Sequence, residues 1–439
     1  MVISSNPPAG ADALARLAES ALAELQAGAA PRFVLDLERA LAALGNGARP
    51  EHATSMVALA AVQSARGDLG PAAAGFERVL ASDGLTPALR AEASAGLAFV
   101  LVRLGEWGRA DTLAGEAREL AARCGPDALY RTALAVSAVV PASRGELPLA
   151  MARIAEVEQA DEGSVLRGAT GGGASDGGAT DRGATGGGAD LLRRAAVLRA
   201  RVCLAIGLND WALLQRVLHE GEHKRVPVHL NRSEWFGLRV LAAWHLGQRE
   251  RSDRLLRDWA EGGPIDGDPY YFAFSSVLHD RDGRVDDELR CIRRALELLG
   301  PGEDPLGRTW IRMVAGTAFS RHGGDYGPVE GLAVYKEARA ELAALGASIF
   351  VVRCDSLIDR AAAGTTASLE HDPLRALSEQ QRRVAALVVQ GFTSPEIAPR
   401  LGVSRKTVDF HVANILARLG ASNRREIGRI LNAAAPDGR

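Results

Sequence analysis

The sequence predicts an all-α protein in which an α-solenoid of helical hairpins precedes a small C-terminal domain of short helices. Between residues 11 and 362, glycine-containing turns recur about every 40 residues. Each turn is followed by an amphipathic segment rich in Ala, Leu, Arg and Glu, which is typical of stacked helical repeats. From residue 377 onward, short apolar runs at helical spacing each begin at a capping residue, which predicts the small domain.

The turn glycines set the repeat of the predicted solenoid. Successive glycines are separated by 38, 40, 62, 40, 36 and 40 residues. The pattern resembles degenerate tetratricopeptide repeats with a slightly long period. Trp107 and Trp211 each follow a turn directly, and we expect both to be packing residues. The glycines are Gly67, Gly105, Gly145, Gly207, Gly247, Gly283 and Gly323.

A Gly-rich insertion explains the one long interval. Residues 167–174 recur identically at 182–189, and residues 163–190 contain too little apolar surface to offset the entropy of ordering them. We therefore expect a disordered loop that divides the solenoid into residues 11–162 and 191–362. A second linker, residues 363–376, precedes the C-terminal domain at residues 377–434.

The C-terminal domain carries consecutive helix start signals. Ser378 with Gln381 and Thr393 with Glu396 are spaced as capping boxes, and Ser404 is placed to cap a third helix. A turn at Gly402 joins the second and third helices, which predicts a helix-turn-helix. The expected inward-facing residues are Val384, Leu387, Val388, Ile397, Leu401, Val408, Val412, Ile415 and Leu419.

The third helix has a polar outer face near its N-terminus. This face holds Arg405, Lys406, Asp409, Phe410, Ala413 and Asn414. Residues 377–439 carry a net charge of +5, which leaves −7 on the rest of a chain whose total is −2. A basic domain attached to an acidic body indicates a DNA-binding protein.

Residues 377 to about 430 resemble the LuxR-type (GerE-like) DNA-binding domain. The resemblance rests on Leu377-Ser378, on the segment Gly391 to Ala398, and on the pattern from Val403 to Gly420. It implies that Lys406, Asp409, Phe410 and Ala413 read base edges, while Thr393, Arg405, Thr407 and His411 hold the DNA backbone. The complete set of expected DNA-binding residues is Thr393, Ser404, Arg405, Lys406, Thr407, Val408, Asp409, Phe410, His411, Ala413 and Asn414.

Two departures from the family pattern bear on DNA binding. Asp409 stands where many members carry Lys, so the preferred DNA sequence cannot be carried over. Pro399 removes a backbone donor inside the second helix, which predicts a bend there. These departures leave open the alternative of a solenoid scaffold for protein partners whose DNA-binding module is vestigial.

The resemblance implies double-stranded DNA as a partner and a homodimer on DNA. The segment after Asn423, with Ile427, Ile430 and Leu431 on one face, is the candidate dimer contact. The predicted function is a transcriptional regulator, in the first instance an activator that works with RNA polymerase. The solenoid would then sense a signal or bind a protein or small-molecule effector.

The segment from Trp211 to Phe274 is a candidate effector site, because it holds 9 of the 21 aromatic residues. Two interpretations stand side by side. The aromatic side chains either line a ligand or peptide groove or pack between hairpins.

Enzyme motifs in the chain are isolated, so we expect no enzyme, cofactor or metal site. His219-Glu220-Gly221-Glu222-His223 matches a zinc-hydrolase motif, but Gly221 is expected to interrupt the helix. The chain has three lysines, Lys224, Lys336 and Lys406, and since none follows a glycine no P-loop can form. The combination therefore resembles the C-terminal half of large ATP-binding LuxR-type regulators, without their nucleotide-binding half.

The remaining sequence features favour the cytoplasm. No apolar run approaches 18 residues, and the first ten residues lack a signal-peptide pattern. Cys124, Cys203, Cys291 and Cys354 fit neither a zinc ribbon nor a disulfide framework, so we expect them to be core residues.

Overall fold

The protein is entirely helical over the residues described by the structure, a computed structural model. Those residues are 11–27, 32–43, 52–124, 127–170, 185–223, 232–300, 304–322, 327–362, 377–419, 424 and 426–428. They form 21 helices and no strand, which confirms the all-α prediction. None of these helices is long and apolar enough to cross a bilayer.

The chain folds into two compact units, and each unit is interrupted in sequence. The first comprises Met1–Pro141, Leu149–Ala200 and Glu220–Asn231, and the second comprises Ala142–Pro148, Arg201–His219 and Arg232–Arg439. The helices up to the Gly-rich insertion are α1 (Ala11–Ala27), α2 (Arg32–Ala43), α3 (Ala53–Arg66), α4 (Leu69–Leu80), α5 (Pro87–Leu104), α6 (Trp107–Cys124), α7 (Asp127–Ser137), α8 (Val139–Arg144) and α9 (Leu147–Thr170).

The helices after the insertion continue to the end of the second unit. They are α10 (Thr185–Gly207), α11 (Trp211–His223), α12 (Arg232–His245), α13 (Arg249–Glu261), α14 (Pro269–Arg281), α15 (Val285–Leu298), α16 (Pro305–His322), α17 (Gly327–Leu345), α18 (Ser348–Ala362), α19 (Glu379–Val389), α20 (Ser394–Arg400) and α21 (Arg405–Leu419).

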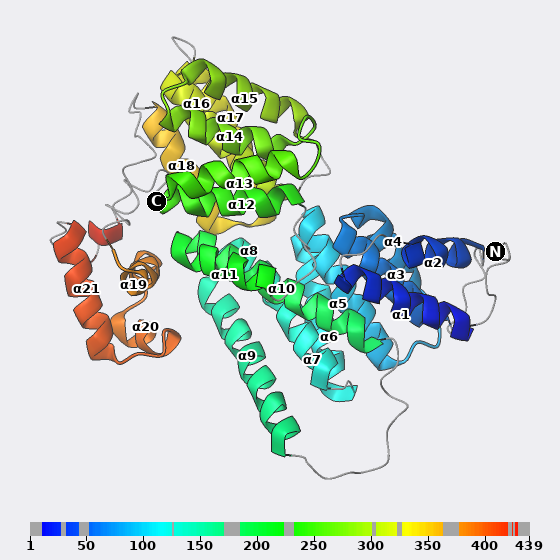
Figure 1. The fold of residues 1–439 in the computed structure, drawn as a ribbon. Coiled ribbons are helices and arrows are strands. Elements are labelled where there is room, and N and C mark those ends of the chain that lie inside the picture. Colours follow the sequence, from blue (N-terminus) through cyan, green and yellow to red (C-terminus); the bar gives the residue numbers. More distant parts are fainter. Residues whose placement is uncertain are drawn as a thin grey trace. The chain divides into compact units, whose positions relative to one another are not determined.

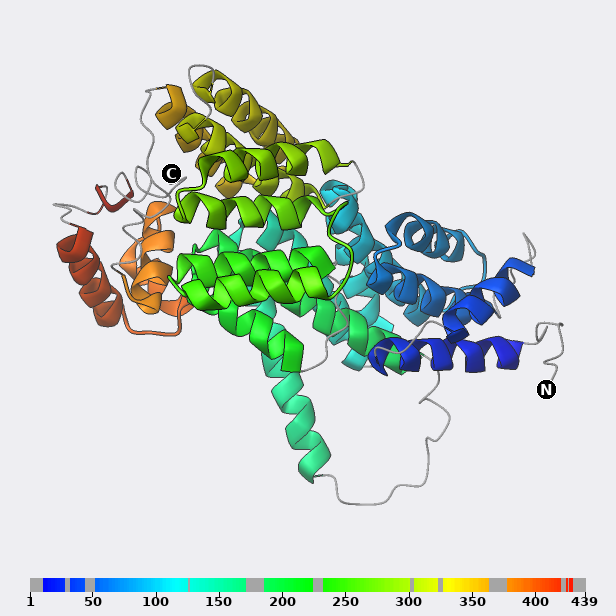
Figure 2. The ribbon, with the colours of Figure 1, turned by 45° about the horizontal axis from the view of Figure 1, so that its top comes forward.

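Within each unit, consecutive helices pack as hairpins, and the hairpins stack. In the first unit α1 packs on α2, α3 on α4 and α5 on α6, while α1, α3, α5 and α7 also contact one another in series. In the second unit the hairpins are α12–α13, α14–α15 and α16–α17, and α12, α14, α16 and α18 form the corresponding series. Figures 1 and 2 show these layers of paired helices. The arrangement is solenoid-like, as the recurring turns predict.

Helices α5 and α15, the first helix of one hairpin and the second helix of another, have different burial patterns. Helix α5 contacts its own partner α6 and the preceding α4 as well as α3 and α7, and every residue from Ala91 to Arg103 is buried. Helix α15 is buried only at Glu288, Ile292 and Ala295, which lie on one face. Helix α5 is therefore enclosed on all sides over this stretch, whereas α15 carries a solvated face.

The predicted glycine turns close the helices through left-handed backbone. Gly67, Gly105, Gly145, Gly247 and Gly283 have φ between 71° and 90°. After Leu104, for example, the N–H groups of Gly105 and Glu106 donate to the carbonyls of Val102 and Leu101 at 3.2 and 2.9 Å, as in a Schellman motif.

Two turns differ from the prediction. Gly207 is the last residue of α10, and the left-handed position falls on Asn209 (φ 53°), whose side-chain amide tolerates that conformation. Gly346 (φ 73°) ends α17 in the same way and was not among the predicted turns. Gly323 lies outside the described residues.

The Gly-rich insertion is shorter than the sequence predicts. Helix α9 continues to Thr170 and α10 begins at Thr185, so both expected limits, 163 and 190, fall inside helices. Gly188 lies against α1, where an added Cβ would come within 3.7 Å of Leu22. Tertiary packing therefore extends α10 into a sequence that local composition assigns to a loop. Residues 171–184 and the expected linker 363–376 lie outside the described residues.

Several residues of the aromatic segment belong to the core of the second unit. Trp211, Trp259, Tyr270 and Phe274 are at most 6% exposed. The indole N–H of Trp259 donates to Asp268 Oδ2 at 3.1 Å. The burial of these four residues supports the interpretation that they pack between hairpins. Trp107, which is 2% exposed, is a packing residue as expected.

The zinc-hydrolase motif lies on α11, which runs without interruption from Trp211 to His223. The expectation that Gly221 breaks this helix is therefore wrong, because one glycine costs a helix only about 1 kcal/mol and neighbouring packing can offset that. Among the cysteines, Cys203 and Cys354 are buried and Cys291 is partly buried, and none of these three forms a disulfide. The side chain of Cys124 lies outside the described residues.

Candidate nucleic-acid interface

Three short helices, α19, α20 and α21, form the C-terminal domain around one small core. The start signals act as the sequence predicts. Ser378 and Gln381 form a reciprocal capping box, with Ser378 N–H donating to Gln381 Oε1 at 2.9 Å and Gln381 N–H donating to Ser378 Oγ at 3.3 Å. In the second capping box, the N–H and the hydroxyl of Thr393 both donate to the Glu396 carboxylate at 2.7 Å.

The capping interaction at the start of α20 changes the pKa of an exposed carboxylate, that of Glu396. The hydroxyl of Thr393, followed by its backbone N–H, lowers the pKa of Glu396 because both groups donate to the ionised form. Glu396 therefore stays charged and keeps Thr393 oriented at the start of α20. The helix continues through Pro399 as far as Arg400, so this proline does not end it.

Ser404 caps helix α21, which begins at Arg405. Thr407 N–H donates to Ser404 Oγ at 3.1 Å, and the two hydroxyls are 2.8 Å apart. The cap fixes the first turn of α21 and leaves Arg405 and Lys406 exposed beside the helix N-terminus. The helix dipole and the two cations make this end attractive to an anion such as a phosphate.

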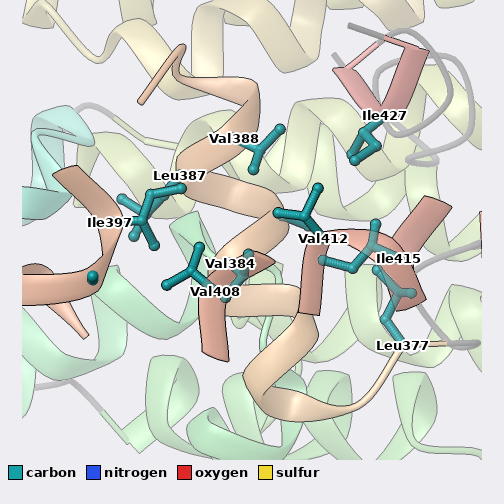
Figure 3. Close-up of a cluster of buried hydrophobic side chains, with 11 residues drawn as sticks. Leu377, Val384, Leu387, Val388, Ile397, Val408, Val412, Ile415 and Ile427 are labelled. Carbon is teal, nitrogen blue, oxygen red and sulfur yellow. The ribbon is translucent and has the colours of Figure 1, made fainter. Parts of the chain in front are cut away.

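The inner face of α21 anchors the helix to the domain core (Figure 3). Val408 and Ile415 are fully buried and Val412 is 9% exposed, at a spacing of three to four residues. They pack with Val384, Leu387, Val388 and Ile397 from α19 and α20. The expected inner stripe is confirmed, with Leu401 and Leu419 partly buried beside it.

Val408 has to be removed from the expected DNA-binding residues. Its side chain is 0% exposed in the domain core, so it cannot reach a ligand. The family pattern at this position reflects packing. Val408 supports the outer face of α21 from behind.

The outer face of α21 is exposed over its first two turns and beyond. Arg405, Lys406, Asp409 and Ala413 are exposed, and Phe410 is 63% exposed although it is a large apolar residue. Thr407, His411 and Asn414 are half-buried at the edges of this face. The structure thus brings these eight expected residues together on one side of one helix. Ser404, at its start, is also exposed.

The charge on this face is mixed. Arg405 Nε lies 3.6 Å from Asp409 Oδ2, one turn further along the helix, and both side chains are more than half exposed. Arg405 is therefore paired with Asp409. Lys406, the neighbouring cation on this face, has no acidic partner within α21.

An arginine outside the predicted set joins the C-terminal segment to α20. Arg424 donates to the Phe392 carbonyl at 2.6 Å and to Ser394 Oγ at 3.1 Å. Burial lowers the pKa of Arg424. Sequence reasoning missed this residue because its partners lie 30 and 32 residues earlier in the chain.

The proposed dimer contact is partly wrong. Ile427 is 0% exposed and packs in the core of its own domain, so it is not available to a second chain. The amphipathic pattern after Asn423 correctly predicted that Ile427 is buried. However, Ile427 packs against its own domain and not against a second chain. Ile430 and Leu431 lie outside the described residues.

The geometry defines a helix-turn-helix domain with an exposed third helix. Residues 375–431 match the family model described as "Bacterial regulatory proteins, luxR family". The C-terminal domain of this chain is therefore a LuxR-family DNA-binding domain.

Similar proteins share this domain. The chain is 45% identical over 56 residues to the "Probable transcriptional regulatory protein SgaR" of Hyphomicrobium methylovorum, covering 13% of this chain and 26% of that protein. It is 40% identical over 75 residues to the "DNA-binding transcriptional activator DevR/DosR" of Mycobacterium tuberculosis, covering 16% and 35%. It is 44% identical over 63 residues to the "Transcriptional regulatory protein UhpA" of Escherichia coli, covering 14% and 31%. The matches thus span about a quarter to a third of each relative.

Proposed function

We propose that this protein is a sequence-specific transcriptional regulator that binds operator DNA through α21. The observation that carries the proposal is the division of α21 into two faces. Val408, Val412 and Ile415 hold one face in the core, while Arg405 and Lys406 stand exposed at the capped N-terminus of the other. A rigid helix of this kind can enter a major groove with its first turns against the base edges.

Each exposed residue has a proposed role in this complex. Lys406, Asp409, Phe410 and Ala413 face the base edges. The ammonium group of Lys406 can donate to guanine, the carboxylate of Asp409 can accept from cytosine N4, and Phe410 can contact a thymine methyl group. The second set, Thr393, Arg405, Thr407 and His411, contacts the DNA backbone, with Asn414 beside it.

The regulator acts as a homodimer on an inverted repeat, which places two copies of α21 in successive major grooves. Because Ile427 is buried within its own domain, the dimer contact has to come from other residues, and Ile430 and Leu431 remain candidates. Sedimentation of the operator complex tests this step. Two chains per site support the dimer, and one chain per site contradicts it.

The helical repeats are the sensory or partner-binding region of the proposed regulator, which works in the cytoplasm. We propose activation as the sign of regulation, in contact with RNA polymerase, because a relative named as a transcriptional activator shares the DNA-binding domain. Transcription from a promoter carrying the selected operator tests the sign. An activator raises transcript levels when the chain is added, and a repressor lowers them.

The test of DNA binding compares the wild-type chain with Lys406→Ala plus His411→Ala. We expect the wild type to select a defined sequence from a random DNA pool and the double variant to lose this occupancy. Arg39→Ala is the matched control for the loss of one positive charge, because Arg39 is 75% exposed on α2. Unchanged occupancy in the double variant would defeat the proposal.

A scaffold for protein partners with a vestigial DNA-binding module is the second candidate. The ion pair of Asp409 with Arg405 favours it, because the pair halves the free positive charge at the tip of α21. Salt dependence separates the two candidates. A regulator binds mixed-sequence DNA with an affinity that falls steeply between about 50 and 200 mM salt. A scaffold shows no such binding while it retains tight protein partners.

A further inference from the structure

Three side chains with metal-binding groups meet in the second unit, far from the helix-turn-helix in sequence. Asp280 lies near the end of α14, Glu288 in the first turn of α15, and His322 at the end of α16. One ligand atom from each lies within 4.8 Å of the other two. His322 Nε2 is 3.3 Å from Asp280 Oδ1 and 3.7 Å from Glu288 Oε2.

Glu288 has a buried carboxylate oxygen that a bound cation would stabilise. Its side chain is 4% exposed, and its Oε2 atom has no hydrogen-bond partner among the described residues. A buried carboxylate oxygen without a partner is unfavourable unless a proton or a cation compensates its charge.

Arg321 orients a second carboxylate. Its guanidinium donates two hydrogen bonds to Asp280, at 2.8 Å to Oδ2 and 2.7 Å to Oδ1. A carboxylate that binds a metal is commonly held by hydrogen bonds of this kind. Asp280 Oδ1 also faces His322 Nε2. The two hydrogen bonds from Arg321 therefore fix the orientation in which the Asp280 carboxylate presents its remaining lone pairs.

The spacing and the donor types suit a small transition-metal ion. A tetrahedral zinc ion with bonds of about 2.0–2.2 Å keeps its ligand atoms about 3.3–3.6 Å apart, close to both distances around His322 Nε2. An imidazole nitrogen favours zinc and its neighbours in the first transition row over magnesium or calcium, which prefer oxygen alone. We propose that Asp280, Glu288 and His322 bind one divalent transition-metal ion of the zinc class, with Arg321 as the outer support of Asp280.

The site connects helices of two adjacent hairpins. Asp280 and Glu288 belong to the α14–α15 hairpin, and His322 belongs to α16 of the next one. A bound ion therefore fixes the packing of α16 on that hairpin. His322 is 27% exposed, which provides the entry route and room for a water molecule as the fourth ligand.

The first experiment measures zinc binding by the full-length, metal-free chain in competition with a chromophoric chelator. We expect one tightly bound zinc ion per chain. His322→Gln and Glu288→Gln each weaken binding by at least about 100-fold, because a ligand change exceeds the 10–100-fold effect of an outer-shell change. Circular dichroism verifies that each variant is folded. Two different ligand variants keep the result interpretable if one of them fails to fold.

The control addresses two histidines outside the proposed site. His219 and His223 are four residues apart on α11 and could bind zinc adventitiously. His219→Gln plus His223→Gln leaves the stoichiometric ion in place if the proposed site is correct. Loss of that ion in this control, with retention in His322→Gln, would assign the zinc to α11 and overturn the proposal. A folded wild-type chain that binds no zinc overturns it as well.

A second readout reports the position of the ion. Binding to the folded chain alone raises the midpoint of thermal unfolding in excess zinc, by roughly 5 °C for a tight site. We expect slower hydrogen exchange in α14, α15 and α16 together with this shift. Equal shifts in the wild type and in His322→Gln contradict the proposed ligands.

Discussion

Helices α5 and α21 differ in how much of their surface neighbouring helices cover. Helix α5 is buried without a break from Ala91 to Arg103, because neighbouring helices surround it. Helix α21 buries one stripe and leaves Arg405, Lys406 and Phe410 exposed. A helix inside a stack of hairpins has no face left for a ligand. A helix held from one side only can present the other side to DNA.

The comparison is tested most strongly by a matched pair of phenylalanine truncations. Phe76 is 2% exposed and fills the space beside Gly96 of α5, whereas Phe410 is 63% exposed on α21. Phe76→Ala should cost about 3–5 kcal/mol of unfolding free energy, because it leaves a cavity. Phe410→Ala should change stability by no more than about 0.5 kcal/mol and weaken DNA binding.

Urea unfolding and DNA titration of both variants measure these effects. The result that contradicts the comparison is a stability loss of similar size in the two variants. Since the two residues are chemically identical, only their surroundings can separate them.

The pH dependence of stability extends the comparison between the helical repeats and the C-terminal domain, because one glutamate in each has a shifted pKa. Burial in α5 raises the pKa of Glu92 from 4.5 to about 7. The folded state therefore binds the Glu92 proton more tightly than the unfolded state, so the favourable contribution is complete below pH 4.5 and is lost as pH rises through about 7. Glu92→Gln should stabilise the chain above pH 7 by an amount on the order of 3 kcal/mol, and the gain should vanish below pH 4.5.

Glu396 in the C-terminal domain serves as the control of opposite sign. Its pKa is lowered by Thr393, so its contribution is present above the unfolded pKa and is lost as the pH falls through the folded value. Glu396→Gln should thus destabilise the domain near neutral pH and have little effect in acid. Stability curves against pH that are parallel for the two variants would count against the assigned burial of Glu92.

A third prediction concerns helix caps of similar strength and different position. Ser404→Ala should cost about 1 kcal/mol of stability in the C-terminal domain, because it removes the bond to Thr407 N–H. Ser378→Ala should cost about the same at the start of α19. We expect Ser404→Ala alone to weaken DNA binding measurably, since α21 carries all the residues proposed to face the bases and α19 carries none of the proposed DNA contacts. Equal DNA affinities in the two variants contradict that assignment.

The smallest expected effect lies in the exposed ion pair of α21. Asp409→Asn removes the partner of Arg405 and should change stability by no more than about 0.5 kcal/mol. Affinity for mixed-sequence DNA should rise by a factor on the order of a few, because a negative charge leaves the face. An unchanged affinity would mean that Asp409 does not face the phosphates or bases. Fluorescence anisotropy at several salt concentrations measures the change.

The sequence predicted the features that depend on neighbours within one or two turns. Ser378 and Ser404 cap the helices where expected, because each bonds to an N–H three residues later. Five of the turn glycines behave likewise, since left-handed backbone is a local requirement. Most of the exposed face of α21 was also predicted, because it occupies one side of a single helix.

Predictions that depended on distant contacts fared less well. The amphipathic pattern marked Ile427 as part of an apolar face, but it did not show that the core of its own domain buries this residue. Gly188 belongs to a helix because α1 packs against it, although its local sequence favours a loop. The proposed metal ligands Asp280, Glu288 and His322 lie in three separate helices, and no spacing along the chain marks them.

The most direct test of the central claim asks whether the outer face of α21 touches DNA. Ala413 is exposed on this face, and Ala122 is exposed on α6 among the helical repeats. Each is changed to cysteine in the full-length chain and offered a selected DNA site that bears a thiol-modified base. The account predicts a disulfide cross-link from Ala413→Cys that is absent with Ala122→Cys and with the wild type. Equal cross-linking from both positions, or none from Ala413→Cys while the chain is bound to the site, would contradict it.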